Sequence, residues 1–247
     1  MTIVGVIPAR IGASRFPRKP LAPILGKPMI VRVLERARLA TSLSRILVAT
    51  DNDEIAAVVS DAGGEFVMTD PALPSGTDRV AAAVRDIPAD IVLNIQGDEP
   101  ALAAQVIDAV AAVLCNDSSI AVTTPAVPFT DETILYKPSA VKVVADARGD
   151  ALYFSRAPIP FPRNPSVSDA ADGLLHIGLY GYRRDALDWF CRTAPSPLER
   201  REGLEQLRFL EAGWHIRIVP VSAMSFGIDT PDDVPLVEAL LREQGVA

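Results

Sequence analysis

The sequence predicts an α/β fold whose core is a doubly wound, mostly parallel sheet. Three buried apolar runs are each followed by apolar side chains at helical spacing, and a polar turn leaves the end of each run. The runs are residues 3–7, 46–49 and 91–96. Shorter strand patterns replace this alternation near residue 120. We therefore expect a single domain, 1–247, with an inserted, smaller β-rich sub-lobe at about residues 125–213.

The composition excludes several classes of protein. The 247 residues are 49% hydrophobic and 22% charged, which is typical of a soluble chain with a substantial core. A pI of about 4.9 argues against binding to nucleic acids or anionic membranes. The two cysteines, Cys115 and Cys191, are too far apart for a cysteine zinc site or a disulfide framework. No apolar run approaches the roughly 20 residues of a membrane span, so we expect a cytoplasmic location.

The first predicted strand leads into a basic loop. No acidic residue precedes Glu35, although the whole chain has a net charge of −7. A local basic cluster in an acidic protein attracts an anion, and the end of a strand in an open α/β sheet is where ligands bind. We therefore expect a polyphosphate here, with a solvated surface loop as the alternative. The basic residues are Arg10, Arg15, Arg18, Lys19, Lys27 and Arg32.

The second unit contains an aspartate with two possible roles. Pro28 suits the first turn of the helix that follows the basic loop. The strand at 46–49 then leads to Asp51, which we expect to cap the next helix, with Glu54 three residues further on. A catalytic role for Asp51 is the alternative.

The third unit begins with a short, small-residue segment. Residues 75–79, Ser-Gly-Thr-Asp-Arg, precede an alanine-rich helix at 80–84. A glycine between two hydroxyl residues lets backbone N–H groups approach a ligand closely, although an N-cap with a turn explains the same pattern. The strand at 91–96 then runs into Gly-Asp-Glu-Pro. Carboxylates at such a strand end commonly hold Mg²⁺, and an acidic first helical turn is the alternative.

The sub-lobe contains a hairpin, a loop and a strand. Residues 141–144 and 151–154 flank a turn and predict the hairpin, and residues 157–173 contain four prolines and predict the loop. The alternation in residues 176–182 predicts one strand with His176, Tyr180 and Tyr182 on the same face.

The C-terminal part returns to the first pattern. A capping box at 196–199 begins a helix that we expect to carry Glu202, Glu205 and Gln206. Glu205 and Gln206 would point about 100° apart on that helix. A strand at 216–219 precedes an acidic turn that contains Asp229 and leads into the last helix.

These parts together suit nucleotidyl transfer. The basic loop would bind a triphosphate, and Mg²⁺ would link it to the acidic turns at Asp98 and Asp229. The chain has no G-x-G-x-x-G after its first strand and no P-loop motif, which argues against a nicotinamide dehydrogenase and a P-loop enzyme. A G-x-S-x-G motif for nucleophilic catalysis is also absent.

An ordered series of motifs resembles the sugar-acid cytidylyltransferases, above all those acting on 3-deoxy-manno-octulosonate (Kdo). Two departures are Arg18, where the family more usually has Gly, and residues 11–13, which replace an aromatic-containing version. The Pro-rich loop at 157–173 has little that matches. The matching blocks are residues 8–10, 14–21, 26–30, 49–51, 75–79, 94–100, 141–144, 153–156, 176–182, 196–199, 204–208 and 227–231.

The resemblance implies a Rossmann-like sheet of the nucleotide-diphospho-sugar transferase type. It also implies a homodimer that joins CTP to Kdo with Mg²⁺ and releases pyrophosphate, giving CMP-Kdo for lipopolysaccharide synthesis. The sub-lobe would contribute the sugar site and dimer contacts. By position, the resemblance assigns metal binding to Asp98 and Asp229, and catalysis to these two residues and Lys19. It assigns CTP binding to Ala9, Arg10, Arg15, Lys19, Ser75, Gly76, Arg79 and Gln96. It assigns sugar binding to Arg156, His176, Tyr180, Glu205 and Gln206.

Other functions remain open from the residues. A different sugar acid, such as 8-amino-Kdo or a sialic-type or legionaminic acid, would keep the same chemistry. A metal-dependent glycosyltransferase would use an acidic turn but would release no pyrophosphate, and the basic loop argues against it. A nucleotide-binding regulatory module would leave Asp98 and Asp229 without a purpose.

Overall fold

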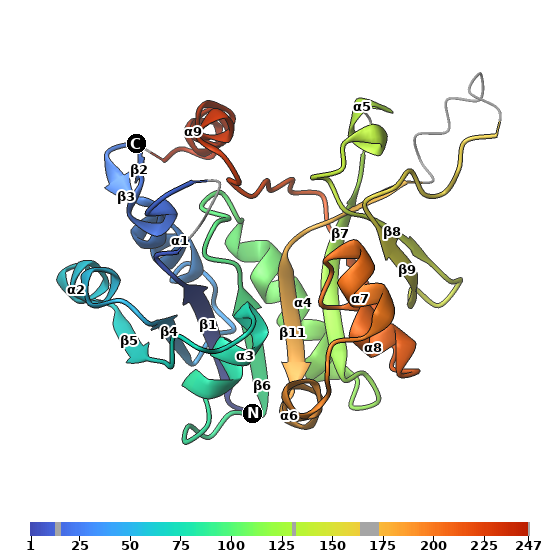
Figure 1. Cartoon of the computed structure of the whole chain (residues 1–247), viewed down its shortest axis with the longest axis horizontal. Helices are drawn as coiled ribbons and strands as arrows, with labels where there is room; N and C mark the ends of the chain where they lie inside the picture. Colours follow the sequence, from blue (N-terminus) through green and yellow to red (C-terminus); the bar gives the residue numbers. More distant parts are fainter. Residues whose placement is uncertain (13–15, 130–131, 164–172, 247) are drawn as a thin grey trace.

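The computed structural model describes residues 1–12, 16–129, 132–163 and 173–246, and one mixed sheet forms their centre (Figure 1). Its ten strands in these residues pair in the order β5-β4-β1-β6-β11-β7-β10-β8-β9, with β12 beside β7. Two short strands, β2 (Pro23–Ile24) and β3 (Lys27–Pro28), form a separate pair. The strands of the large sheet are β1 (Ile3–Ala9), β4 (Arg45–Thr50), β5 (Glu65–Met68), β6 (Ile91–Ile95), β7 (Val122–Pro128), β8 (Lys142–Ala145), β9 (Ala151–Ser155), β10 (Leu174–His176), β11 (Leu179–Arg183) and β12 (Ile216–Pro220).

The predicted α/β fold class is confirmed. Strands β5, β4, β1 and β6 are neighbours and run parallel, so their carboxyl ends meet at one edge. Strand β11 pairs antiparallel with both β6 and β7, although it comes late in the chain. The strands between residues 125 and 213 therefore extend the same sheet, and β11 places that part of the chain beside the parallel strands.

Helices cover both faces of the sheet, as a doubly wound fold requires (Figure 1). One apolar cluster includes residues of α1, α2 and α4, and a second includes residues of α3, α6 and α8. The helices are α1 (Met29–Ala37), α2 (Asp53–Asp61), α3 (Gly76–Ala83), α4 (Ala104–Asn116), α5 (Glu132–Tyr136), α6 (Arg184–Arg192), α7 (Pro197–Glu202), α8 (Leu207–Glu211) and α9 (Val234–Glu243), with short 3₁₀ helices η1 (Lys19–Leu21) and η3 (Pro231–Asp233).

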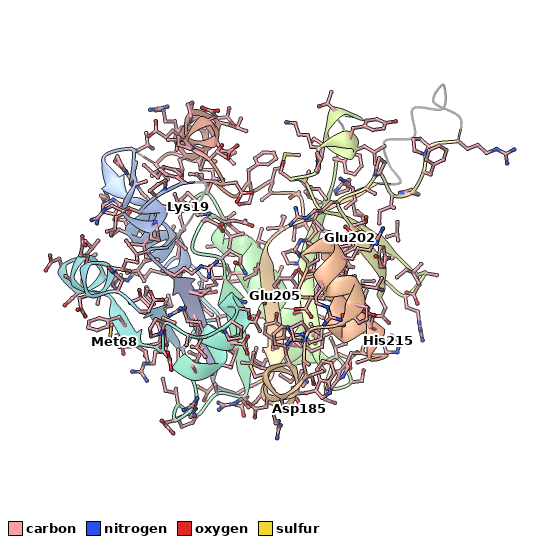
Figure 2. The ribbon with its side chains drawn as sticks, viewed as in Figure 1. Lys19, Met68, Asp185, Glu202, Glu205 and His215 are labelled. Atoms are coloured by element: carbon pink, nitrogen blue, oxygen red, sulfur yellow. The ribbon has the colours of Figure 1, made fainter. Side chains whose placement is uncertain are left out.

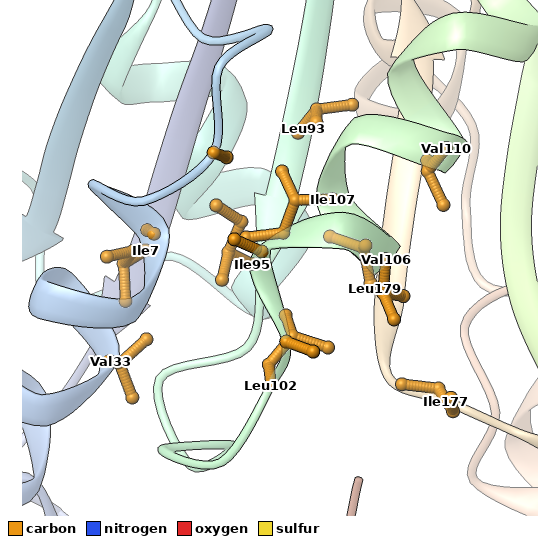
Figure 3. Packing of buried hydrophobic residues seen from close by; sticks show 14 of the residues in the cluster. Ile7, Val33, Leu93, Ile95, Leu102, Val106, Ile107, Val110, Ile177 and Leu179 are labelled. Atoms are coloured by element: carbon orange, nitrogen blue, oxygen red, sulfur yellow. The ribbon is translucent and has the colours of Figure 1, made fainter. Parts of the chain in front are cut away.

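Alternation within the central strands fills both clusters. In β1, Ile3 and Ile7 belong to the first cluster, whereas Val4 and Val6 belong to the second. Figure 3 shows β6 residues Leu93 and Ile95 close to the α4 side chains Val106, Ile107 and Val110. Each such fully buried aliphatic side chain contributes about 1.5–3 kcal/mol relative to exposure. The parallel strands are consequently a rigid base for the turns that follow them.

The predicted cap of α2 is wrong by one residue. The side chain of Asn52, not Asp51, accepts hydrogen bonds from the backbone N–H groups of Glu54 and Ile55, at 3.0 and 3.2 Å. Both residue types are good caps, but the Asp51 carboxylate is engaged by Arg79 of α3. A contact distant in sequence therefore decides which residue caps the helix.

Two predicted elements are each divided in the structure. The capping box at Ser196 is confirmed, but its helix ends at Glu202 because Gly203 adopts a left-handed conformation with φ 65°. Glu205 and Gln206 therefore lie in the turn before α8, not on one helix. The strand predicted at 176–182 is split into β10 and β11, although its aromatic residues do share one face.

Other predicted elements agree more closely with the structure. The hairpin of β8 and β9 is confirmed. The helix predicted at residues 80–84 begins earlier, at Gly76, and α1 begins immediately after Pro28. Residues 157–163 of the Pro-rich loop form no helix or strand, and residues 164–172 lie outside the described residues. Within the described ranges, every helix is too short or too polar to span a bilayer.

Candidate active site

A cavity of about 530 Å³ lies where the turns after β1 and β6 face the entrance of α3. Its opposite wall comes from β11 and from the turn that precedes α8. Figure 2 shows Lys19 and Glu205 toward the middle of the molecule, whereas Met68, Asp185 and His215 are peripheral. Twelve sequence-predicted residues line this one cavity: Ala9, Arg10, Lys19, Ser75, Gly76, Arg79, Gln96, Asp98, Tyr180, Glu205, Gln206 and Asp229.

Three predicted site residues are not among those lining residues. Arg15 lies outside the described residues. Arg156 donates to the main-chain oxygens of Glu202 and Pro138, at 2.9 and 3.0 Å, and so ties the hairpin to the end of α7. His176 lies behind Tyr180, with its ring centroid 5.3 Å from the tyrosine ring. Direct contact of Arg156 and His176 with a sugar remains a prediction.

The environment of His176 favours a neutral ring. Its Nε2 lies 2.9 Å from the hydroxyl of Thr124, and its ring also meets Phe154 edge-on. Burial lowers the pKa of His176 to about 3. The imidazole is therefore uncharged near neutral pH and acts as support for Tyr180 in this arrangement.

Lys19 lies between the two predicted acidic turns. Its Nζ is 2.7 Å from Asp98 Oδ2 and 3.9 Å from Asp229 Oδ1, and it donates to the main-chain oxygen of Ile228 at 2.8 Å. The carboxylate side chains are 32% and 38% exposed, so a ligand can still reach them. Two turns that are 131 residues apart in the sequence thus converge on one cation.

Arg18, which stands where the related sequences more usually have glycine, has an unusual backbone conformation. Arg18 adopts φ 58° and ψ 27°, in the left-handed region that glycine enters without steric penalty. Its exposed side chain forms an ion pair with Glu54. The structure thus keeps a glycine-like backbone before Lys19 although the side chain is arginine, and the lysine still reaches Asp98.

Gly97 holds the acidic turn against the end of β1. A Cβ at this position would lie 2.6 Å from the main-chain oxygen of Pro8, which is closer than real side chains approach. We expect Gly97→Ala to lower stability by about 1–3 kcal/mol and to reduce activity, because the Asp98 turn and the basic loop must separate. Thermal melting and turnover measurements test this.

Gly227→Ala is the matched control for that substitution. Its Cβ would meet no atom closer than 3.9 Å, so its melting temperature should stay near that of the unchanged chain. Equal stability of the two alanine variants would contradict the close approach at Gly97.

Ser75 serves both predicted roles, because it caps α3 and lines the cavity. Its Oγ accepts a hydrogen bond from the backbone N–H of Asp78 at 3.1 Å. Next to it, the hydroxyl of Thr77 donates to Glu205 Oε2 at 2.6 Å and so joins the two sides of the cavity. Burial raises the pKa of Glu205, with the Thr77 hydrogen bond opposing that rise.

Sequence reasoning missed several residues of this site. Thr77 and Tyr182 line the cavity, and the Ser-Gly-Thr segment and the strand alternation already contained them. Glu99 is buried and accepts the backbone N–H of Gly178 at 2.9 Å, so it ties the acidic turn to the break before β11. Burial raises the pKa of Glu99 to about 7, and the charge of Asp98 adds to this.

The carboxylates at the cavity suit a magnesium ion that is also bound by phosphate. Among the described residues, no group of three or more His, Cys, Asp or Glu side chains forms a self-sufficient metal site. Asp98 and Asp229 supply hard, partly exposed carboxylate oxygens, and both carboxylates lie near one positive charge, the ammonium of Lys19. Mg²⁺ is commonly held by one or two carboxylates together with substrate phosphates, so this donor set fits it.

Comparisons with known proteins identify the family of this chain. Residues 4–218 match the family model described as Cytidylyltransferase. The 3-deoxy-manno-octulosonate cytidylyltransferase of Syntrophotalea carbinolica is 50% identical, covering 98% of this chain and 99% of the relative. The protein with the same name from Bdellovibrio bacteriovorus is 44% identical over the full length of both chains.

Solved structures show the same similarity in three dimensions. A CMP:2-keto-3-deoxy-manno-octonic acid synthetase complexed with CTP superimposes with a TM-score of 0.92 at 41% identity, covering 99% of this chain and all of that one. A cytidylyltransferase from Leptospira borgpetersenii superimposes with a TM-score of 0.66 at 16% identity, which shows a shared fold.

Proposed function

The chain belongs to the 3-deoxy-manno-octulosonate cytidylyltransferases, and from this premise we propose how its cavity transfers CMP from CTP to Kdo. The anomeric hydroxyl oxygen of Kdo attacks the α-phosphorus, and its proton passes to water. The bond from that phosphorus to the α–β bridging oxygen breaks, and pyrophosphate leaves. The observation that carries this proposal is the convergence of Lys19, Asp98 and Asp229 in the cavity that also contains the α3 entrance.

The N-terminal wall binds the nucleotide in this proposal. Arg10 and Lys19 neutralise the triphosphate, and Lys19 is nearest to the charge that develops on it. Arg15, by position in the same loop, would assist them. Ser75, Gly76, Arg79 and Gln96 would recognise the cytosine and ribose, and Ala9, which lines the same cavity, would also contact CTP. Asp98 and Asp229 would hold Mg²⁺, which when bound supplies charge neutralisation to the phosphates.

The opposite wall binds the sugar acid in this proposal. Tyr180, Glu205 and Gln206 present a hydroxyl, a carboxylate and an amide to the cavity, and these groups suit the several hydroxyls of Kdo. His176 would support Tyr180 from behind. The Kdo carboxylate suits an arginine, and Arg156 is the residue that the resemblance assigns to it.

The test is a substrate matrix scored by pyrophosphate release. CTP, UTP and ATP are each combined with Kdo, 8-amino-Kdo, a sialic acid and neutral sugars, with and without Mg²⁺. We expect release only with CTP, a Kdo-type acid and the metal. Activity confined to UTP and neutral sugars would overturn the proposal, and preference for another sugar acid would correct the substrate.

We further propose a cytoplasmic homodimer. Leu152 and Phe161 are 62% and 80% exposed on and after the hairpin, and Tyr136 is 61% exposed on α5. These three side chains are the apolar residues that we assign to the dimer contact of the sub-lobe. Light scattering during size-exclusion chromatography should give twice the monomer mass of 26.4 kDa, and a monomer mass would contradict the dimer.

A further inference from the structure

Asp51 belongs to a sequence motif, but neither helix capping nor the proposed chemistry accounts for its carboxylate. It follows β4, and its Oδ2 lies 2.8 Å from Nη2 of Arg79 on α3. The two side chains are only 13% and 4% exposed. A buried ion pair of this kind adds little net stability over a well-packed apolar pair, because both charges lose their hydration. Its presence beside the cavity therefore points to a role in placing Arg79.

Two partners fix the guanidinium of Arg79 at the cavity wall. Nη2 donates to Asp51, and Nη1 donates to the hydroxyl of Thr69. Thr69 is itself anchored, because its backbone N–H and its hydroxyl both donate to the main-chain oxygen of Thr50, at 2.8 and 3.0 Å. The ends of β4 and β5 thus hold both terminal nitrogens of one side chain.

The remaining donors of Arg79 suit a ligand. A guanidinium has five N–H groups, and the hydrogen bonds to Thr69 and Asp51 use one on each terminal nitrogen. Arg79 lines the cavity beside Ser75 and Gly76. The second carboxylate oxygen of Asp51, Oδ1, is buried and has no hydrogen-bond partner among the described residues. The hydrogen bond that the Asp51 carboxylate accepts from a side chain therefore comes from Arg79. Burying Oδ1 without a hydrogen bond lowers the stability of the fold, so a functional reason for keeping Asp51 here is more plausible than a structural one.

A fixed set of donors distinguishes cytosine from uracil. Cytosine presents two neighbouring acceptors, O2 and the unprotonated N3, whereas N3 of uracil carries a proton. A guanidinium only donates, so it matches cytosine and opposes the N3–H of uracil. Discrimination of this kind requires that the guanidinium cannot turn away from the wrong base. When UTP binds, N–H donors of the Arg79 guanidinium and the N3–H of uracil are buried without acceptors, which weakens the binding of UTP.

We propose that Asp51 is a positioning residue that fixes Arg79 and thereby makes the enzyme select CTP over UTP. This inference rests on the proposed cytidylyltransferase function. Asp51 acts through Arg79 and does not touch the base. Thr69 has the same role to a smaller extent, because its hydroxyl is a neutral partner, whereas the Asp51 carboxylate is charged.

The experiment measures kcat/KM for CTP and for UTP, each with Kdo and Mg²⁺, in the unchanged chain and in variants. We expect Asp51→Asn to reduce the CTP-to-UTP ratio by about tenfold or more, chiefly through the KM for CTP. The KM for Kdo should not change. Thr69→Val should lower the ratio by less, and it decides the matter if Asp51→Asn does not fold.

Glu199→Gln is the matched control. It breaks a comparably buried ion pair, since Arg208 Nη2 lies 2.5 Å from Glu199 Oε1 and the side chains are 5% and 10% exposed. We expect this variant to melt at a lower temperature but to keep the CTP-to-UTP ratio. Folded Asp51→Asn or Thr69→Val protein with an unchanged ratio would overturn the inference. Absence of pyrophosphate release from CTP and Kdo by the unchanged chain would instead reject the proposed function.

Discussion

Replacing Asp98 with Asn is expected to lower kcat on the order of a hundredfold or more while the fold survives. The change keeps the shape of the side chain and removes the charge that faces Lys19 at 2.7 Å. It would also weaken the binding of a metal ion that Asp98 and Asp229 hold together. The charge of the triphosphate would then be less well neutralised during transfer. The turn should stay in place, because Ile228 donates its N–H to the main-chain oxygen of Asp98, at 2.9 Å, and not to the carboxylate.

Pyrophosphate release, Mn²⁺ binding and thermal melting together test this expectation. Asp229→Asn should behave in the same way as Asp98→Asn. Asp188→Asn is the control, because Asp188 is 43% exposed and pairs with Arg184 on α6, a helix that contributes no residue to the cavity lining. Near-normal turnover and Mn²⁺ binding in both site variants would place the metal elsewhere.

Replacing Lys19 with Met is expected to lower kcat/KM for CTP on the order of a hundredfold. Two effects contribute to this loss. The variant lacks a contact to the phosphates, and it lacks the positive charge that lies between two carboxylates in the unchanged chain. Without the ammonium, Asp98 and Asp229 face each other as like charges and repel the incoming triphosphate. Titration calorimetry with CTP should show weaker binding, and pyrophosphate release should fall in parallel.

Arg18→Gly is the neighbouring control for the Lys19 variant. Glycine adopts φ 58° without strain, and the Arg18 side chain contacts exposed Glu54, away from the acidic pair. We therefore expect CTP affinity and melting temperature close to those of the unchanged chain. A larger loss in Arg18→Gly than in Lys19→Met would show that Arg18, and not Lys19, is the phosphate ligand.

Most of the proposed nucleotide wall could be predicted from residues that follow strands. Lys19, Ser75 and Asp98 each lie after an apolar run, and parallel strands bring such turns to one edge of the sheet. The wall assigned to the sugar was harder to predict. Gly203 divides the expected helix, so the positions of Glu205 and Gln206 depend on a left-handed residue and on the Thr77 hydrogen bond.

The sequence by itself determined the α/β class, the buried strands and the ordered motifs that identify the family. Those properties come from local periodicity and residue type, which a single chain displays directly. Only the tertiary structure decided that Asn52 caps α2 while Asp51 holds Arg79, that Lys19 lies between Asp98 and Asp229, and that His176 lies behind Tyr180. Each of these depends on which groups compete for one partner across the fold, and sequence spacing does not specify that competition.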